Sequence, residues 1–254
     1  MREGQKVYLE QCAMCHGIRG DGKGFLAAGF DVKPRDFQRG LYRFRSTAAG
    51  ELPAIEDIEQ RVRLGVKDST MPAWGEFLTD AQIKAVSRYL VVFSPRFVTA
   101  WKAGKKPTVL PVSKPPADLG ALAARGAGVW KKLECAKCHG KLGLGDGPSA
   151  ASLKDDWGHA IRATDLTYKW SFKNGARPED MYRTFISGLD GTPMPAYAGP
   201  LPDETDRWAL VAFVLSLSPE TRPVLHANEL AAQRATRIGR RGHVMPAAPA
   251  KGTP

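Results

Sequence analysis

All four cysteines of this 254-residue chain lie in two copies of one short motif, Cys-x-x-Cys-His-Gly. Residues 12–17 read CAMCHG, and residues 135–140 read CAKCHG. Paired thiols at this spacing serve three chemistries in proteins: tetrahedral zinc binding, reversible dithiol oxidation, and covalent attachment of haem. The sequence around each copy has to distinguish among them.

The surroundings of the two motifs favour haem attachment. A structural zinc site usually joins two ligand pairs across a short loop, whereas 123 residues separate these two. A thioredoxin-like dithiol follows a buried strand, whereas residues 4–10 and 126–134 have the pattern of helices. In haem attachment the two thiols form thioethers and the adjacent His binds iron. The sequence therefore predicts two covalently bound haem c groups, attached through Cys12, Cys15, Cys135 and Cys138, with His16 and His139 as proximal ligands.

Two methionines are the candidates for the sixth iron ligand. Met71 and Met194 each begin a Met-Pro-Ala-aromatic sequence, and each lies 59 residues after the first Cys of its motif. Thioether sulfur is a common partner of His in electron-carrying cytochromes, where it raises the reduction potential. The alternative is that both are flexible core residues, but the matched spacing favours the axial pairs His16/Met71 and His139/Met194.

The matched spacing extends to the rest of the chain, which reads as an internal repeat. A Gly-Asp-Gly turn follows each motif, and each half then has a short and a long amphipathic helix pattern, the long one at 80–95 or 203–219. We predict an all-α fold with two tandem domains that each have their own core. The predicted boundaries are residues 1–100 for the first domain, 101–119 for a Pro- and Lys-rich extended linker, 120–225 for the second domain and 226–254 for a basic, flexible tail.

Each half resembles a class I cytochrome c domain. The resemblance rests on the attachment motifs, the Met-Pro loops, the aromatic residues Tyr8 and Trp130 ahead of each motif, and a last helix carrying Tyr89 or Phe213. It implies that the first and last helices of each domain cross, with haem in a crevice between the His and Met sides. The long inserts between His and Met resemble those of cytochrome subunits that accompany periplasmic or membrane-associated oxidoreductases, including molybdenum enzymes.

The insert of the first half also supplies donors for the haem propionates, in the sequence PRDFQRGLYRFR at 34–45. We expect at least one of Arg43 and Arg45 to reach a propionate, against the alternative of a solvated basic loop. His159 lies in the second half and is a further candidate iron ligand. Because Met194 fits that role better, we expect His159 to be a surface residue or a neighbour of the site.

Charge and hydropathy bear on the partners and on the location. Of the net charge of +11, seven charges lie in residues 101–120 and 226–254, outside the two domains. No nucleic-acid-binding motif is present, and the longest apolar run is too short for a membrane span. Bacteria attach haem to this motif outside the cytoplasmic membrane, so we expect a periplasmic or otherwise extracytoplasmic protein whose signal peptide is absent from this chain.

The predicted function is transfer of single electrons between a redox donor and acceptor. These partners include, as one option, a molybdenum oxidoreductase or a membrane respiratory complex. The alternative is a dihaem enzyme of the peroxidase or thiosulfate-oxidising type, which needs an open or displaceable sixth position on one iron. A third option is an electron-transfer subunit within a larger complex.

Overall fold

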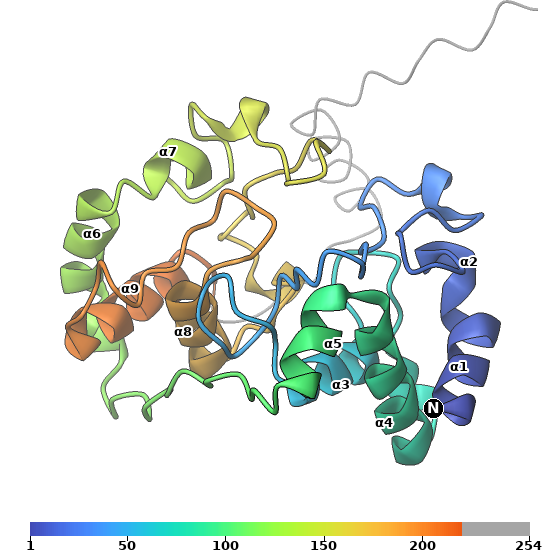
Figure 1. Ribbon diagram of the computed structural model, residues 1–254. Coiled ribbons are helices and arrows are strands. Elements are labelled where there is room, and N and C mark those ends of the chain that lie inside the picture. The colour runs from blue at the N-terminus through green and yellow to red at the C-terminus, as the bar shows by residue number, and fades with distance from the viewer. Residues whose placement is uncertain (220–254) are drawn as a thin grey trace, which may run out of the picture. The chain divides into compact units, whose positions relative to one another are not determined.

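The computed structural model describes residues 1–219, and residues 1–218 form one compact unit (Figure 1). Helices and turns account for the described part of the chain, in which the only β-type pairs are two isolated bridges. The predicted all-α class is confirmed for these residues. The predicted tail, 226–254, lies outside the described residues. None of the helices within 1–219 is long and apolar enough to cross a membrane.

The first half is built from helices that enclose one apolar core. Helix α1 packs against α4, and Gly4 on α1 faces the backbone of Ala85, with no room for a side chain between them. The helices are α1 (Arg2–Val7), a π-helical turn (Tyr8–Cys12), α2 (Ala13–His16), α3 (Ile55–Leu64) and α4 (Asp80–Leu90). The predicted helix at 80–95 starts where its capping residues place it, because Thr79 and Gln82 form a capping box.

The second half repeats this arrangement around a separate core. Helix α6 crosses α9 (Figure 1), and Gly126 on α6 meets Ala209 and Phe213 at the crossing, as Gly4 meets α4 in the first half. The helices are α6 (Ala123–Lys132), α7 (Ala136–His139), α8 (Pro178–Ser187) and α9 (Glu204–Ser216). The crossing of the first and last helices, which the resemblance implied, is present in both halves.

The end of the first half differs from the prediction. The helix expected over 80–95 ends at Leu90, and after a short 3₁₀ turn a new helix, α5 (Pro95–Lys102), begins. The predicted helix ended at Pro95, but Pro is favoured at the first position of a helix because it lacks only an N–H that has no intrahelical partner there. Helix α5 therefore runs past the predicted boundary between domain and linker.

The segment predicted as an extended linker packs against both halves. Val109 pairs with Thr47 in an isolated bridge, and the Leu110 N–H donates to the Ser46 carbonyl at 2.8 Å. Further along, Ser113 accepts a hydrogen bond from the Trp208 indole at 3.0 Å. The linker is therefore part of the packed structure and helps to join the two halves.

Candidate cofactor-binding sites

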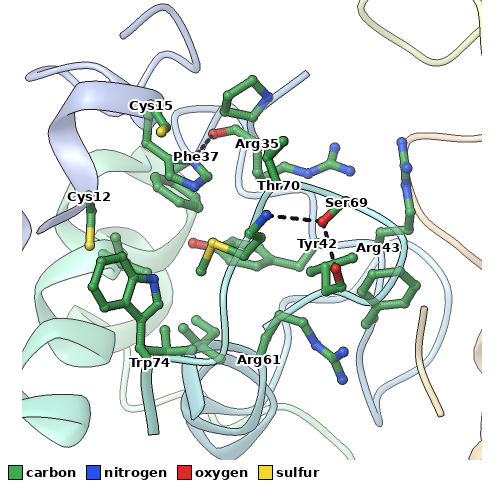
Figure 2. A pocket seen from close by; sticks show the side chains of 18 of the residues that line it. Cys12, Cys15, Arg35, Phe37, Tyr42, Arg43, Arg61, Ser69, Thr70 and Trp74 are labelled. Atoms are coloured by element: carbon green, nitrogen blue, oxygen red, sulfur yellow. Dashed lines mark hydrogen bonds between the residues drawn. The ribbon is translucent and has the colours of Figure 1, made fainter. Parts of the chain in front are cut away.

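Both motif histidines are oriented by a backbone carbonyl. His16 ends α2, and its Nδ1 lies 2.9 Å from the Arg35 carbonyl oxygen (Figure 2). His139 ends α7, and its Nδ1 lies 3.1 Å from the Thr164 carbonyl oxygen. A hydrogen bond at one ring nitrogen leaves the other available to a metal, which is the usual arrangement of metal-binding histidines. Burial lowers the pKa of both rings, so both stay in the neutral form that binds metals.

Aromatic rings hold each of these imidazoles. Phe37 stacks on His16, with ring centroids 4.6 Å apart and planes inclined by 21°. In the second half Trp130 lies against His139 at 5.9 Å between centroids. Tyr8, which corresponds to Trp130, instead donates a hydrogen bond from its hydroxyl to the carbonyl of Gly17, the last residue of the first motif. The aromatic residues ahead of the two motifs thus hold the motif segments in place.

The motif cysteines do not have the properties of a redox-active dithiol. Burial raises the pKa of Cys12 to about 12 and that of Cys135 to about 11. Reactive dithiols and zinc ligands occupy sites that lower the thiol pKa, because the thiolate is the reactive species. Buried thiols with a raised pKa fit attachment through thioether carbon–sulfur bonds, which carry no charge.

The two methionine loops are held by the same hydrogen bonds. The Met71 N–H donates to Ser69 Oγ at 3.2 Å, and the Val66 N–H donates to the Met71 carbonyl at 3.1 Å. The corresponding bonds in the second half run from the Met194 N–H to Thr192 Oγ1 at 3.2 Å and from the Leu189 N–H to the Met194 carbonyl at 3.1 Å. The internal repeat therefore includes the backbone geometry of both loops.

A glycine closes the base of each loop. Gly65 and Gly188 have φ angles of 63° and 67°, in the left-handed region that favours glycine. A Cβ atom at either position would meet the backbone of the proline that follows the methionine, Pro72 or Pro195. The glycine that ends α3 or α8 thus lets the Met-Pro segment fold back against the helix.

A pocket in the first half brings the four predicted residues of that half together. Cys12, Cys15, His16 and Met71 all line it, and with its opening to solvent its volume is about 1130 Å³. In Figure 2 the two cysteines lie on one side, and Arg43 and Arg61 lie across the pocket from Cys12. The pocket therefore has two thiols on one side, cationic groups across from Cys12, and an imidazole and a thioether in its lining.

The residues that line this pocket include polar atoms that lack partners among residues 1–219. Tyr42 Oη, Arg43 Nε and Arg61 Nε are buried and find no hydrogen-bond acceptor among residues 1–219. All three residues line the pocket, and unpaired buried donors are rare in folded proteins. Three such donors on residues that line one pocket fit a ligand that carries carboxylates, as a haem does. The pocket residues therefore fit the predicted cofactor.

Arg45, the other arginine expected to reach a propionate, does not line the pocket. Its side chain is fully buried against the second half of the chain, where it pairs with Asp190 at 2.7 Å. Of the two predicted donors, only Arg43 lies at the site. The sequence of alternating basic and aromatic residues at 42–45 gives no indication that neighbouring arginines serve different purposes.

In the second half, the segment after Met194 lies next to the attachment motif. Tyr197 and Cys135 pack against the same apolar core, and burial, followed by electrostatic interaction with Cys135 and Cys138, raises the pKa of Tyr197 to about 12. The side chain of His159 is 46% exposed and lies 3.4 Å from the Asp155 carboxylate. His159 is thus a surface residue, as expected.

Several residues of the first pocket were missed by the sequence analysis. Phe37, Arg61 and Trp74 line it, and so does Lys173 from the second half of the chain. Arg61 lies on α3 between the buried residues Ile58 and Val62. Its position in the helical repeat is the sequence signal that indicates a side chain close to the core. For Lys173 the sequence carries no signal, because its contact depends on how the two halves pack.

Two family models match separate parts of the chain. The family model "cytochrome C oxidase, cbb3-type, subunit III" matches residues 1–90, and the family model "cytochrome c" matches residues 123–218. A chain from the reducing HAO-like protein complex of Kuenenia stuttgartiensis has a similar solved structure, with 40% sequence identity and a TM-score of 0.80 over 86% of this chain and 97% of that one. No curated protein matches the chain.

Proposed function

The chain belongs to the c-type cytochromes, with two cytochrome c domains in tandem and two covalently bound haem c groups, and from this premise we propose that it carries single electrons between redox proteins outside the cytoplasm. The observation that carries the proposal is the first pocket, where the attachment cysteines, His16 and Met71 line one space. The extracytoplasmic location is supported by the place where bacteria attach haem to this motif.

We propose that His16 with Met71, and His139 with Met194, are the axial ligand pairs. Haem bound in this way supplies a one-electron couple whose potential depends on the ligands and on burial. The chain's own residues hold the proposed iron ligands in place. The carbonyls of Arg35 and Thr164 fix the two imidazoles, and Ser69 and Thr192 fix the backbone of the two methionines. A site that barely rearranges suits electron transfer, because little has to move as the electron arrives or leaves.

The partners are proposed to belong to a larger redox assembly in which this chain is the electron-transfer subunit. The support is that the similar solved chain comes from a reducing HAO-like protein complex, and that the family model matching residues 1–90 describes an oxidase subunit. A molybdenum enzyme as the partner stays a prediction.

The first prediction concerns access to the iron in the native protein. If Met71 and Met194 both bind iron, the reduced holoprotein at neutral pH will bind carbon monoxide poorly, and the oxidised protein will show the near-infrared band of Met-to-iron charge transfer. Titration with carbon monoxide, followed by absorbance, measures this directly. Rapid stoichiometric binding at one haem would instead favour the dihaem enzyme, since one sixth position would then be open.

The second prediction concerns the hydroxyl of Tyr42, which we propose donates to a haem propionate. Tyr42→Phe removes that donor and is expected to destabilise the holoprotein by about 2 kcal/mol, as for a hydrogen bond to a charged group. Denaturant unfolding of the holoprotein provides the measurement.

Ser87→Ala is the matched control, because Ser87 Oγ is also buried without a partner among residues 1–219 but does not line the pocket. Removing a hydroxyl that truly lacks a partner is neutral or stabilising. A Tyr42→Phe variant that behaved like Ser87→Ala would refute the proposed contact.

A further inference from the structure

Arg45 belongs to the first half of the chain, but its guanidinium is inserted into the second. The side chain has no exposed surface, and Nη2 donates to the Ser187 carbonyl and to the Asp190 carboxylate, both at 2.7 Å. Its other nitrogens donate to the carbonyls of Tyr42 and Ala48 in its own half, at 3.3 and 3.2 Å. A buried arginine satisfied from both sides makes a specific connection between the two halves.

The residues that Arg45 binds hold the start of the Met194 loop. Ser187 is the last residue of α8, and Asp190 lies between Gly188, which closes the loop, and Met194. Asp190 also accepts a hydrogen bond from the Gly50 N–H of the first half, at 3.1 Å. The first half of the chain therefore binds the segment that carries the methionine of the second half.

A second contact supports the same loop. Gly191 has a φ of 77°, and a Cβ atom there would collide with the ring of Trp157. Trp157 is in turn held by the first half, because its indole N–H donates to the Asp36 carboxylate at 3.0 Å and the guanidinium groups of Arg35 and Arg39 lie over its ring at 4.5 and 4.9 Å. The Met194 loop is thus packed on a tryptophan whose position depends on the first half.

The Met71 loop of the first half is in turn bound by residues of the second half. Lys173, from the second half, donates to the Asp68 carbonyl at 2.8 Å and lies 3.5 Å from the Asp68 carboxylate. Asp68 has a φ of 52°, a left-handed conformation that costs free energy in a residue other than glycine. Arg61 joins the same contact, since it donates to the Gly65 carbonyl at the base of the loop and to the Lys173 carbonyl. Each methionine loop is therefore bound by the half of the chain that does not contain it.

From this reciprocal arrangement we propose that the interface between the halves positions both sixth-ligand loops. Arg45 is the positioning residue for the Met194 loop, and Lys173 is the positioning residue for the Met71 loop. The inference rests on the proposed Met ligation of both haems. Under this proposal, the axial ligation and the reduction potential of each haem depend on the packing of the other domain. The chain then works as one two-haem unit and not as two independent electron carriers joined by a linker.

The test uses the full-length holoprotein and reads one haem at a time. In a Met71→Ala background the near-infrared charge-transfer band reports Met194 alone, and in a Met194→Ala background it reports Met71 alone. Adding Arg45→Gln to the first background is expected to weaken the remaining band, to lower the potential of the second haem, and to increase the fraction of that haem open to carbon monoxide about tenfold, as for coupled groups in contact. Lys173→Gln should act in the same way only in the second background.

Arg63→Gln is the matched control, because Arg63 pairs with Asp80 at 2.6 Å on the exposed surface, and both residues belong to the first half. It should change neither band. If Arg45→Gln fails to fold with two haems per chain, Asp190→Asn removes the same ion pair but keeps a side-chain oxygen that can accept a hydrogen bond from Arg45. A band from Met194 that persists unchanged in both variants would overturn this inference while leaving the proposed ligation intact. Absence of any such band in the wild-type protein would overturn the ligation, and this inference with it.

Discussion

Replacing Met71 by Ala will open one haem to carbon monoxide and lower its reduction potential, by on the order of 0.2 V within the span that axial ligands set. The reason is that Met71 lines the same pocket as His16 and the attachment cysteines, and its backbone is fixed by Ser69 and Val66. Loss of the thioether leaves the sixth position to water or carbon monoxide and removes the ligand that favours ferrous iron. Potentiometric titration with absorbance detection will resolve the two haems.

The equivalent change at Met194 tests whether the internal repeat is also a repeat of function. Because the two loops contain equivalent hydrogen bonds, Met194→Ala should open the other haem to a similar extent. Ala substitution at Met14 is the control, since Met14 lies inside the first motif but its side chain points to solvent, 54% exposed. The ligand assignment would be refuted by a Met71→Ala or Met194→Ala protein whose potentials match those of Met14→Ala.

The other large effect is expected at the helix crossing of the second half. Gly126→Ala places a methyl group against the backbone carbonyl of Ala209 and the side chain of Phe213, at a point where α6 and α9 leave no space. Since backbone cannot move aside as a flexible side chain does, we expect a loss of about 3 kcal/mol in the free energy of unfolding, the upper part of the range for overpacked cores. Thermal or denaturant unfolding of the holoprotein is the measurement.

Gly128, two residues further along the same helix, provides the matched control. It is exposed, and a Cβ atom there meets nothing within 4 Å among the described residues. Gly128→Ala should therefore stabilise the protein by about 0.5–1 kcal/mol, from helix propensity alone. Equal effects of the two substitutions would show that the close crossing of α6 and α9 does not limit stability.

The sequence by itself determined the chemistry of the sites and the repeat. The spacing within Cys-x-x-Cys-His is local, so it is readable without the fold, and the identical distances to Met71 and Met194 indicated two copies of one domain. Helical periodicity and capping residues such as Thr79 placed the main helices correctly, because short-range interactions decide where a helix begins. The same local reasoning failed at Pro95, where one residue type is compatible with both the end of a helix and its start.

Only the tertiary structure decided how the two halves act on each other. Arg43 and Arg45 are two residues apart with the same chemistry, yet one lines the first pocket and the other is buried against Asp190 in the second half. Lys173 similarly lies beside a loop 105 residues away in the chain. Contacts of this kind depend on the relative orientation of two separately formed cores. That orientation is set by the sum of many long-range packing and hydrogen-bonding terms, for which no short sequence pattern exists.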